Sequence, residues 1–146
     1  WLAVLRTSTS HFSPIGIPGG VLLLLALIRW RRPEARLVAA LGVVSQSPFP
    51  YEAMPVFFVP RSRAEYYVLL IGSDVALAVY AHFRGLPLAE YWRINGIAVV
   101  VCMYLPALVM VLRRPNEGVV PAWLERTAAF LPRRLRGEAV HSGLRQ

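Results

Sequence analysis

The chain has 146 residues, of which 56% are hydrophobic and only 16% are charged, whereas soluble domains carry about 25% charged residues. All 16 basic residues are arginines, and the net charge of +8 is spread between apolar runs instead of along one face. This composition excludes an ordinary soluble domain, and the spacing argues against nucleic-acid binding, which needs a basic stripe with stacking aromatic residues. We therefore expect a multi-pass protein of the cell membrane whose surroundings are the lipid bilayer.

The first apolar stretch covers residues 13–28 and predicts a membrane-spanning helix that is dense in leucine. Pro14 and Pro18 lie in its first turns, where the missing backbone N–H costs least. The chain begins at Trp1 without a signal-peptide pattern, so we expect it to be the C-terminal fragment of a longer protein. Helices preceding Trp1 would then be its partners in the membrane.

The second apolar stretch, residues 37–59, contains Pro48, Pro50 and Pro55, so no straight helix can pass through it. If it crossed the membrane, the arginines after the first stretch and those after the fourth would lie on opposite sides. That would break the rule that arginines stay on the cytoplasmic side. A re-entrant hairpin keeps the two groups together, and a kinked spanning segment is the alternative. Because such a hairpin exposes backbone polar groups, we expect other protein segments to cover it.

The third stretch, residues 64–83, and the fourth, residues 94–112, are both long enough to span a bilayer. Pro106 lies inside the fourth stretch and predicts a kink there. The expected fold class is therefore all-α integral membrane. It has three transmembrane helices, one proline-broken re-entrant or kinked segment, and an interfacial helix in the C-terminal tail.

We expect the tail, residues 113–146, to form a basic cytoplasmic region separate from the membrane-embedded residues 1–112. Apolar and small residues recur in it at about helical spacing, which predicts a short helix in the membrane interface: Val120, Trp123, Leu124, Thr127 and Leu131. Three arginines follow, at positions suited to anionic lipid headgroups: Arg133, Arg134 and Arg136.

Two carboxylates and a phenol are the candidate site residues. Asp74 lies near the middle of the third stretch, where a charged side chain costs about 3 kcal/mol, so it should face protein or a cavity rather than lipid. It would line a substrate or proton path or make a contact between helices. Glu52 follows Tyr51 at the tip of the expected hairpin, where it could meet a polar ligand or serve only as a turn residue. The single cysteine, Cys102, and three scattered histidines predict no metal site and no cofactor.

The segment SQSPFPYE, residues 45–52, followed by AMPVFFVP, resembles a late segment of the polyprenyl-phosphate-dependent membrane glycosyltransferases of the GT-C type. The nearest subgroup is alpha-mannosyltransferase-like. Ser47, Pro48, Phe49 and Tyr51 match its pattern, and Glu52 stands where an Asp is common. The resemblance implies transfer of a mannose-like sugar from a polyprenyl-phosphate donor to an extracytoplasmic acceptor. It places the catalytic carboxylate upstream of Trp1, so no catalytic residue is assigned, and Tyr51, Glu52 and Asp74 are expected to bind substrate.

The resemblance leaves two matters open. A reaction at the outer face needs a site on the side of the membrane opposite the arginines. The arginine count, however, makes the hairpin enter from the cytoplasmic side. The hairpin would therefore have to reach deep into the membrane. A non-enzymatic membrane component is the alternative function, either a portion of a transporter with Asp74 on its path or a small structural subunit. The sequence therefore leaves open whether the chain is part of an enzyme.

Overall fold

The structure is a computed structural model that describes residues 13–44 and 50–118, and within these ranges every regular element is a helix. The predicted interfacial helix of the tail and three residues of the resemblance, Ser47, Pro48 and Phe49, lie outside the described ranges. The elements in chain order are η1 (Pro14–Gly16), η2 (Gly20–Arg29), α2 (Pro33–Val43), η3 (Pro50–Phe58), α3 (Arg63–His82), α4 (Leu88–Val99), η4 (Val100–Tyr104) and α5 (Leu105–Leu112).

The last three elements join into one long helix, Leu88–Leu112, which contains the fourth predicted stretch. The irregularity expected from Pro106 takes the form of a π-helical segment, η4, in which the Leu105 N–H bonds to the Val100 carbonyl. Pro106 has no N–H to offer to the carbonyl four residues earlier, which belongs to Cys102. The hydrogen bonds of η4 span five residues instead of four, and this local change of spacing just before Pro106 is consistent with a carbonyl that has lost its usual partner.

Helix α3 confirms the third predicted stretch to within one residue at each end. It begins at the N-cap Ser62, whose side-chain oxygen accepts a hydrogen bond of 3.1 Å from the Glu65 N–H. The helices Arg63–His82 and Leu88–Leu112 are each long and apolar enough to cross a membrane by length and composition. Residues 13–44 and 50–118 contain no third helix that is long and apolar enough to span.

The first predicted stretch, residues 13–28, folds into two 3₁₀ segments instead of one α-helix. They are joined through Gly19, which has a left-handed backbone with a φ of 84°. Helix η2 has three residues per turn, so Gly20, Leu23 and Ala26 lie in one line, and these are its buried residues. Ten residues of 3₁₀ helix extend about 20 Å, which is shorter than the hydrocarbon core of a bilayer, about 30 Å.

The proline-containing stretch forms two short helices whose outer ends meet. Helix α2 leads away from Pro33, and η3 leads back to Phe58, after which Arg61 contacts Glu34 at 2.7 Å. A 3₁₀ geometry runs through Pro55 in η3 and again gives a three-residue stripe of buried side chains: Ala53, Val56 and Val59. The two halves therefore form a hairpin that starts and finishes at the same end of the bundle.

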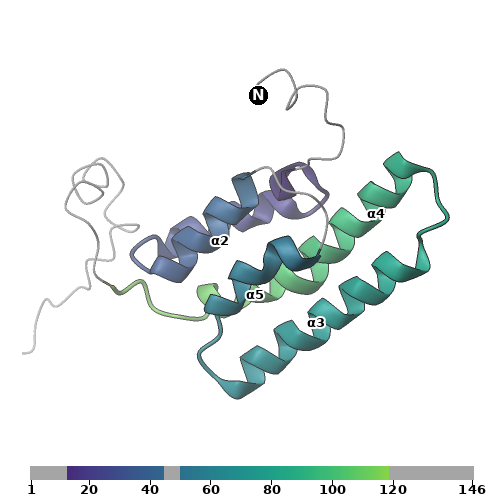
Figure 1. Cartoon of the computed structure of the whole chain (residues 1–146). Helices are drawn as coiled ribbons and strands as arrows, with labels where there is room; N and C mark the ends of the chain where they lie inside the picture. The colour runs from purple at the N-terminus through teal and green to yellow at the C-terminus, as the bar shows by residue number, and fades with distance from the viewer. Residues whose placement is uncertain (1–12, 45–49, 119–146) are drawn as a thin grey trace, which may run out of the picture.

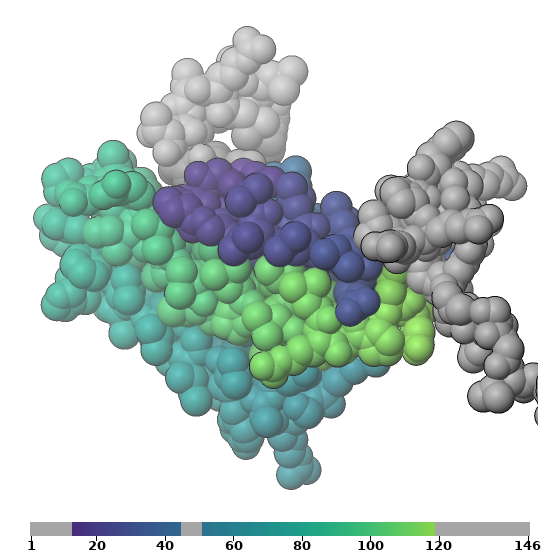
Figure 2. All heavy atoms as spheres, turned by 180° about the vertical axis from the view of Figure 1, so that it is seen from behind, coloured from purple at the N-terminus to yellow at the C-terminus, as the bar shows by residue number. Residues whose placement is uncertain are grey.

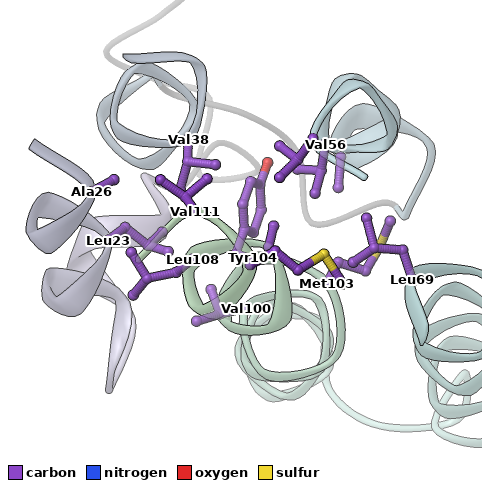
Figure 3. Packing of buried hydrophobic residues seen from close by; sticks show 14 of the residues in the cluster. Leu23, Ala26, Val38, Val56, Leu69, Val100, Met103, Tyr104, Leu108 and Val111 are labelled. Carbon is purple, nitrogen blue, oxygen red and sulfur yellow. The ribbon is translucent and has the colours of Figure 1, made fainter. Parts of the chain in front are cut away.

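The long helix occupies the centre of the bundle. Both overall views show it between η2 and α2 on one side and α3 on the other (Figures 1 and 2). Tyr104 and Met103 are fully buried, and Figure 3 shows Tyr104 between Val38 of α2 and Val56 of η3, with Met103 toward Leu69 of α3. One helix thus joins every layer of the described core.

The outer surface is apolar as well. Large hydrophobic side chains are exposed on η2 and α3, among them Leu22, Leu27, Ile71 and Leu77. A soluble monomer rarely exposes apolar patches of this extent. A surface of this kind suits contact with lipid or with other membrane helices.

Candidate functional site

One end of the bundle, which we call the arginine end, collects the chain segments around residues 29–34, 59–65 and 112–118. Arg114 lies at its centre. Its guanidinium donates to the Val59 carbonyl at 2.8 Å and to Glu65 Oε2 at 2.7 Å, and it lies 3.7 Å from Glu34 Oε1. A single cation therefore ties the end of α5 to α2, to the segment after η3 and to α3.

Glu34 is the second junction of this network. Arg61 donates to its Oε1 from Nε at 3.1 Å and from Nη2 at 2.7 Å. Burial acts to raise the pKa of Glu34, but its backbone hydrogen bond, its hydrogen bond with Arg61 and the charges of Arg61 and Arg114 outweigh burial and lower it below 4.5. Glu34 is therefore an anion that fastens the two ends of the hairpin together.

Further contacts at the arginine end hold the end of the long helix and the segment that follows it. Arg29 donates from Nε and Nη2 to the Leu112 carbonyl, at 3.3 Å each, and Arg32 donates to the Pro115 carbonyl. The Arg31 N–H donates to Asn116 Oδ1 at 3.0 Å. Cations beside the last carbonyls of a helix complement its dipole. Arg29 is thus joined to the end of α5, and Arg31 and Arg32 are joined to the segment after it.

Tyr51 and Glu52 lie at the start of η3, at the inner end of the hairpin. Val59 follows Tyr51 by eight positions, so at the rise of a 3₁₀ helix Tyr51 lies about 16 Å along η3 from the arginine end. The Tyr51 side chain is 60% exposed, and that of Glu52 is half-buried. The structure therefore places both residues well inside the bundle's length, with Tyr51 accessible from outside.

Asp74 lies on the outward face of α3. The packed face of this helix carries Leu69, Gly72 and Ala76, and a position two residues beyond Gly72 is about 200° around the helix from it. Asp74 is exposed and makes no hydrogen bond or ion pair with the described residues, so nothing joins it to Glu52. The sequence predicts that Asp74 faces protein or a cavity, but no described residue packs opposite its carboxylate.

An apolar groove runs between α3 and α5 near the arginine end. It has a volume of about 480 Å³, and its walls include Val68 of α3 and Leu105 and Val109 of α5. Glu65 and Arg113 lie at its polar end. The arrangement offers a slot for an apolar chain with a cation beside it.

Asn95 is a buried polar residue that the sequence reasoning missed. Its side chain is 1% exposed, and neither of its amide atoms has a hydrogen-bond partner in the described structure. A lone amide at the start of the fourth apolar stretch was the available signal. Hydropathy does not indicate whether such a residue faces the core or the surroundings, because that depends on how the helices pack.

No group of three or more metal-binding side chains gathers in the described ranges. Comparisons of the chain with protein-family models, curated proteins and solved structures found no match.

Proposed function

We propose that the bundle is embedded in a cell membrane as a multi-pass protein with its arginine end in the cytoplasm. Support comes from α3 and the long helix, which have the length and composition of membrane spans. Two arginines, Arg84 and Arg93, lie near the α3–α4 turn. A larger number, eight, lie at or near the arginine end: Arg29, Arg31, Arg32, Arg36, Arg61, Arg63, Arg113 and Arg114. An excess of arginine marks the cytoplasmic side.

In this arrangement α2 and η3 form the re-entrant hairpin. The contact between Glu34 and Arg61 supports a return to the side of entry, because a crossing would separate these residues by the bilayer thickness. The third crossing in the proposal is residues 13–28. Since η2 is about 20 Å long, the bilayer would have to thin beside it, as it does around short spans.

The function we propose is the C-terminal membrane portion of a glycosyltransferase that moves a mannose-like sugar from a polyprenyl-phosphate donor to an extracytoplasmic acceptor. The observation that carries the proposal is the depth of the hairpin. Tyr51 lies about 16 Å from the arginine end, which is near the middle of a core about 30 Å thick. A cavity that is open to the outer side could meet the hairpin there, so cytoplasmic entry and outer-face transfer are compatible.

Within this function Tyr51 and Glu52 bind the donor. A phenol and a carboxylate suit the hydroxyl groups of a sugar, since the carboxylate accepts hydrogen bonds that the hydroxyls donate. The resemblance puts the catalytic carboxylate in a loop upstream of Trp1, so no chemical step is assigned to this chain.

A photoreactive polyprenyl-phosphate mannose in reconstituted vesicles tests the donor site. We expect cross-links at residues 51–54, lowered several-fold by Tyr51→Ala and by Glu52→Gln, and left unchanged by Glu90→Gln at the far end of the bundle. Cross-links that concentrate elsewhere on the chain, or that survive both hairpin substitutions, would refute the donor site.

A second candidate function, a structural subunit of a membrane assembly, is favoured by Asp74. An exposed carboxylate in the middle of a spanning helix is costly in lipid and is usually paired with another group. The described arginines all lie near the ends of the bundle, so a second copy of these residues brings no cation to that depth. The occupant that fits the α3 face is therefore a transmembrane helix with a basic side chain at its midpoint.

Energy transfer in vesicles tests this pairing with two synthetic leucine-rich transmembrane peptides, one with a central lysine and one without. The subunit function predicts association with the lysine peptide only, and its loss in Asp74→Leu. Equal association of both peptides, or association that is unchanged in Asp74→Leu, would remove it. The donor cross-linking of the hairpin does not depend on this outcome.

A further inference from the structure

The groove between α3 and α5 lies beside a point where α3 closely approaches the long helix at η4. At Gly72 an added Cβ would lie 2.0 Å from the Cys102 carbonyl oxygen, so only a glycine permits this approach. Nearer the arginine end the walls of the groove stand apart at Val68 on one side and Val109 on the other. Figure 1 shows α3 running alongside the long helix.

Along the long helix the groove extends about as far as one lipid chain in one leaflet, and its α3 wall, from Ala64 to Val68, covers about 6 Å of that length. Its residues on the long helix extend from Val101 to Arg113, which corresponds to about 18 Å along the axis. One leaflet of the hydrocarbon core is about 15 Å thick. The floor and walls between these ends are apolar, as an acyl chain requires.

The charge at the polar end favours an anion. Arg113 is exposed, and its guanidinium has no hydrogen bond or ion pair with the described residues. Arg63, next to the groove residue Ala64, is exposed in the same way. Glu65 also borders the groove, but its Oε2 accepts hydrogen bonds from Arg114 and from the Arg61 N–H, at 2.7 Å each. Its charge is therefore offset, and the cations at the mouth remain available.

We propose that this groove binds an anionic phospholipid, with one acyl chain between α3 and α5 and the phosphate on Arg113. A guanidinium can donate two parallel hydrogen bonds to a phosphate, which distinguishes Arg113 from a diffuse positive surface. The site lies at the arginine end, whereas the proposed sugar-donor site lies at the inner end of the hairpin. The two proposals therefore stand on different residues and can fail separately.

The test measures which lipids stay bound to the full chain. The protein is reconstituted in phosphatidylcholine with a minor fraction of phosphatidylglycerol, extracted gently and analysed by native mass spectrometry. We expect phosphatidylglycerol to be enriched on the wild type and Arg113→Gln to lower that enrichment about fivefold, as the loss of one arginine near a lipid phosphate implies. Arg93→Gln, an exposed arginine toward the other end, is the matched control and should leave the enrichment unchanged.

A second variant tests the apolar part of the site. Val109→Trp fills the groove while Arg113 remains, and it should lower retention of phosphatidylglycerol although the charge is intact. Val109 is exposed on the groove wall, so the substitution does not crowd the buried core, and a thermal unfolding curve checks that the variant folds. Enrichment that survives both Arg113→Gln and Val109→Trp would overturn the proposal, as would an equal loss in Arg93→Gln.

Discussion

Replacing Arg114 should loosen the whole arginine end. In Arg114→Gln the charge-assisted hydrogen bonds to the Val59 carbonyl and to Glu65 are lost, and each such bond contributes about 1.5–3 kcal/mol. Breaking a fully buried ion pair costs about 3–5 kcal/mol. Arg114 and Glu34 are 11% and 12% exposed, but Glu65 is 28% exposed, so water compensates part of the loss. We expect the free energy of unfolding to fall by about 3 kcal/mol.

The assay is reversible unfolding in detergent micelles, followed by circular dichroism during titration with a denaturing detergent. Arg93→Gln is the control, because an exposed residue without a partner among the described residues should change the free energy of unfolding by no more than about 0.5 kcal/mol. A double-mutant cycle with Glu65→Gln should show coupling, since the two side chains are in contact. If Arg114→Gln destabilises the chain no more than Arg93→Gln does, the network described above does not hold the bundle together.

Three further substitutions test other parts of the fold. Gly72→Ala should cost about 1–3 kcal/mol in the same assay, because its Cβ would meet the Cys102 carbonyl, whereas Gly85→Ala has open space around it and should be tolerated. Leu23→Ala in the buried stripe of η2 should cost about 2–5 kcal/mol, and its exposed neighbour Leu24→Ala much less. Because the pKa of Glu34 is lowered in the fold, its contribution is complete above pH 4.5 and declines as the pH falls below that value. The difference in thermal stability between wild type and Glu34→Gln should therefore shrink in acid, and a difference that is constant down to pH 3 would contradict the ion pair.

The two long helices were predictable because stretches of about twenty predominantly apolar residues leave few other structures. The arginine count predicted that both ends of the hairpin lie on the same side of the membrane, and the contact between Glu34 and Arg61 agrees with that prediction. The 3₁₀ geometry of η2 could not be read from the sequence. Leucine occupies each of positions 22–25, so the three-residue period of its buried stripe is hidden.

The candidate site was less predictable than the fold. Arg113 and Arg114 are neighbours of the same type, and only the rotation of α5 makes one the centre of the ion network and leaves the other at the groove. The outward position of Asp74 likewise depends on which face of α3 packs on the long helix. The donor-binding roles of Tyr51 and Glu52 stay predictions, because they rest on the resemblance and on the depth of the hairpin.

Thiol labelling can measure whether both ends of the hairpin lie on the same side of the membrane. In a variant with Cys102 replaced by serine, single cysteines at Pro33, Arg63 and Leu88, all exposed positions, would be labelled in oriented vesicles with a thiol reagent that does not cross membranes. The account predicts that Pro33→Cys and Arg63→Cys react from the same side and that Leu88→Cys reacts from the other. Labelling of Pro33→Cys and Arg63→Cys from opposite sides would show that residues 37–59 cross the membrane and would contradict the hairpin.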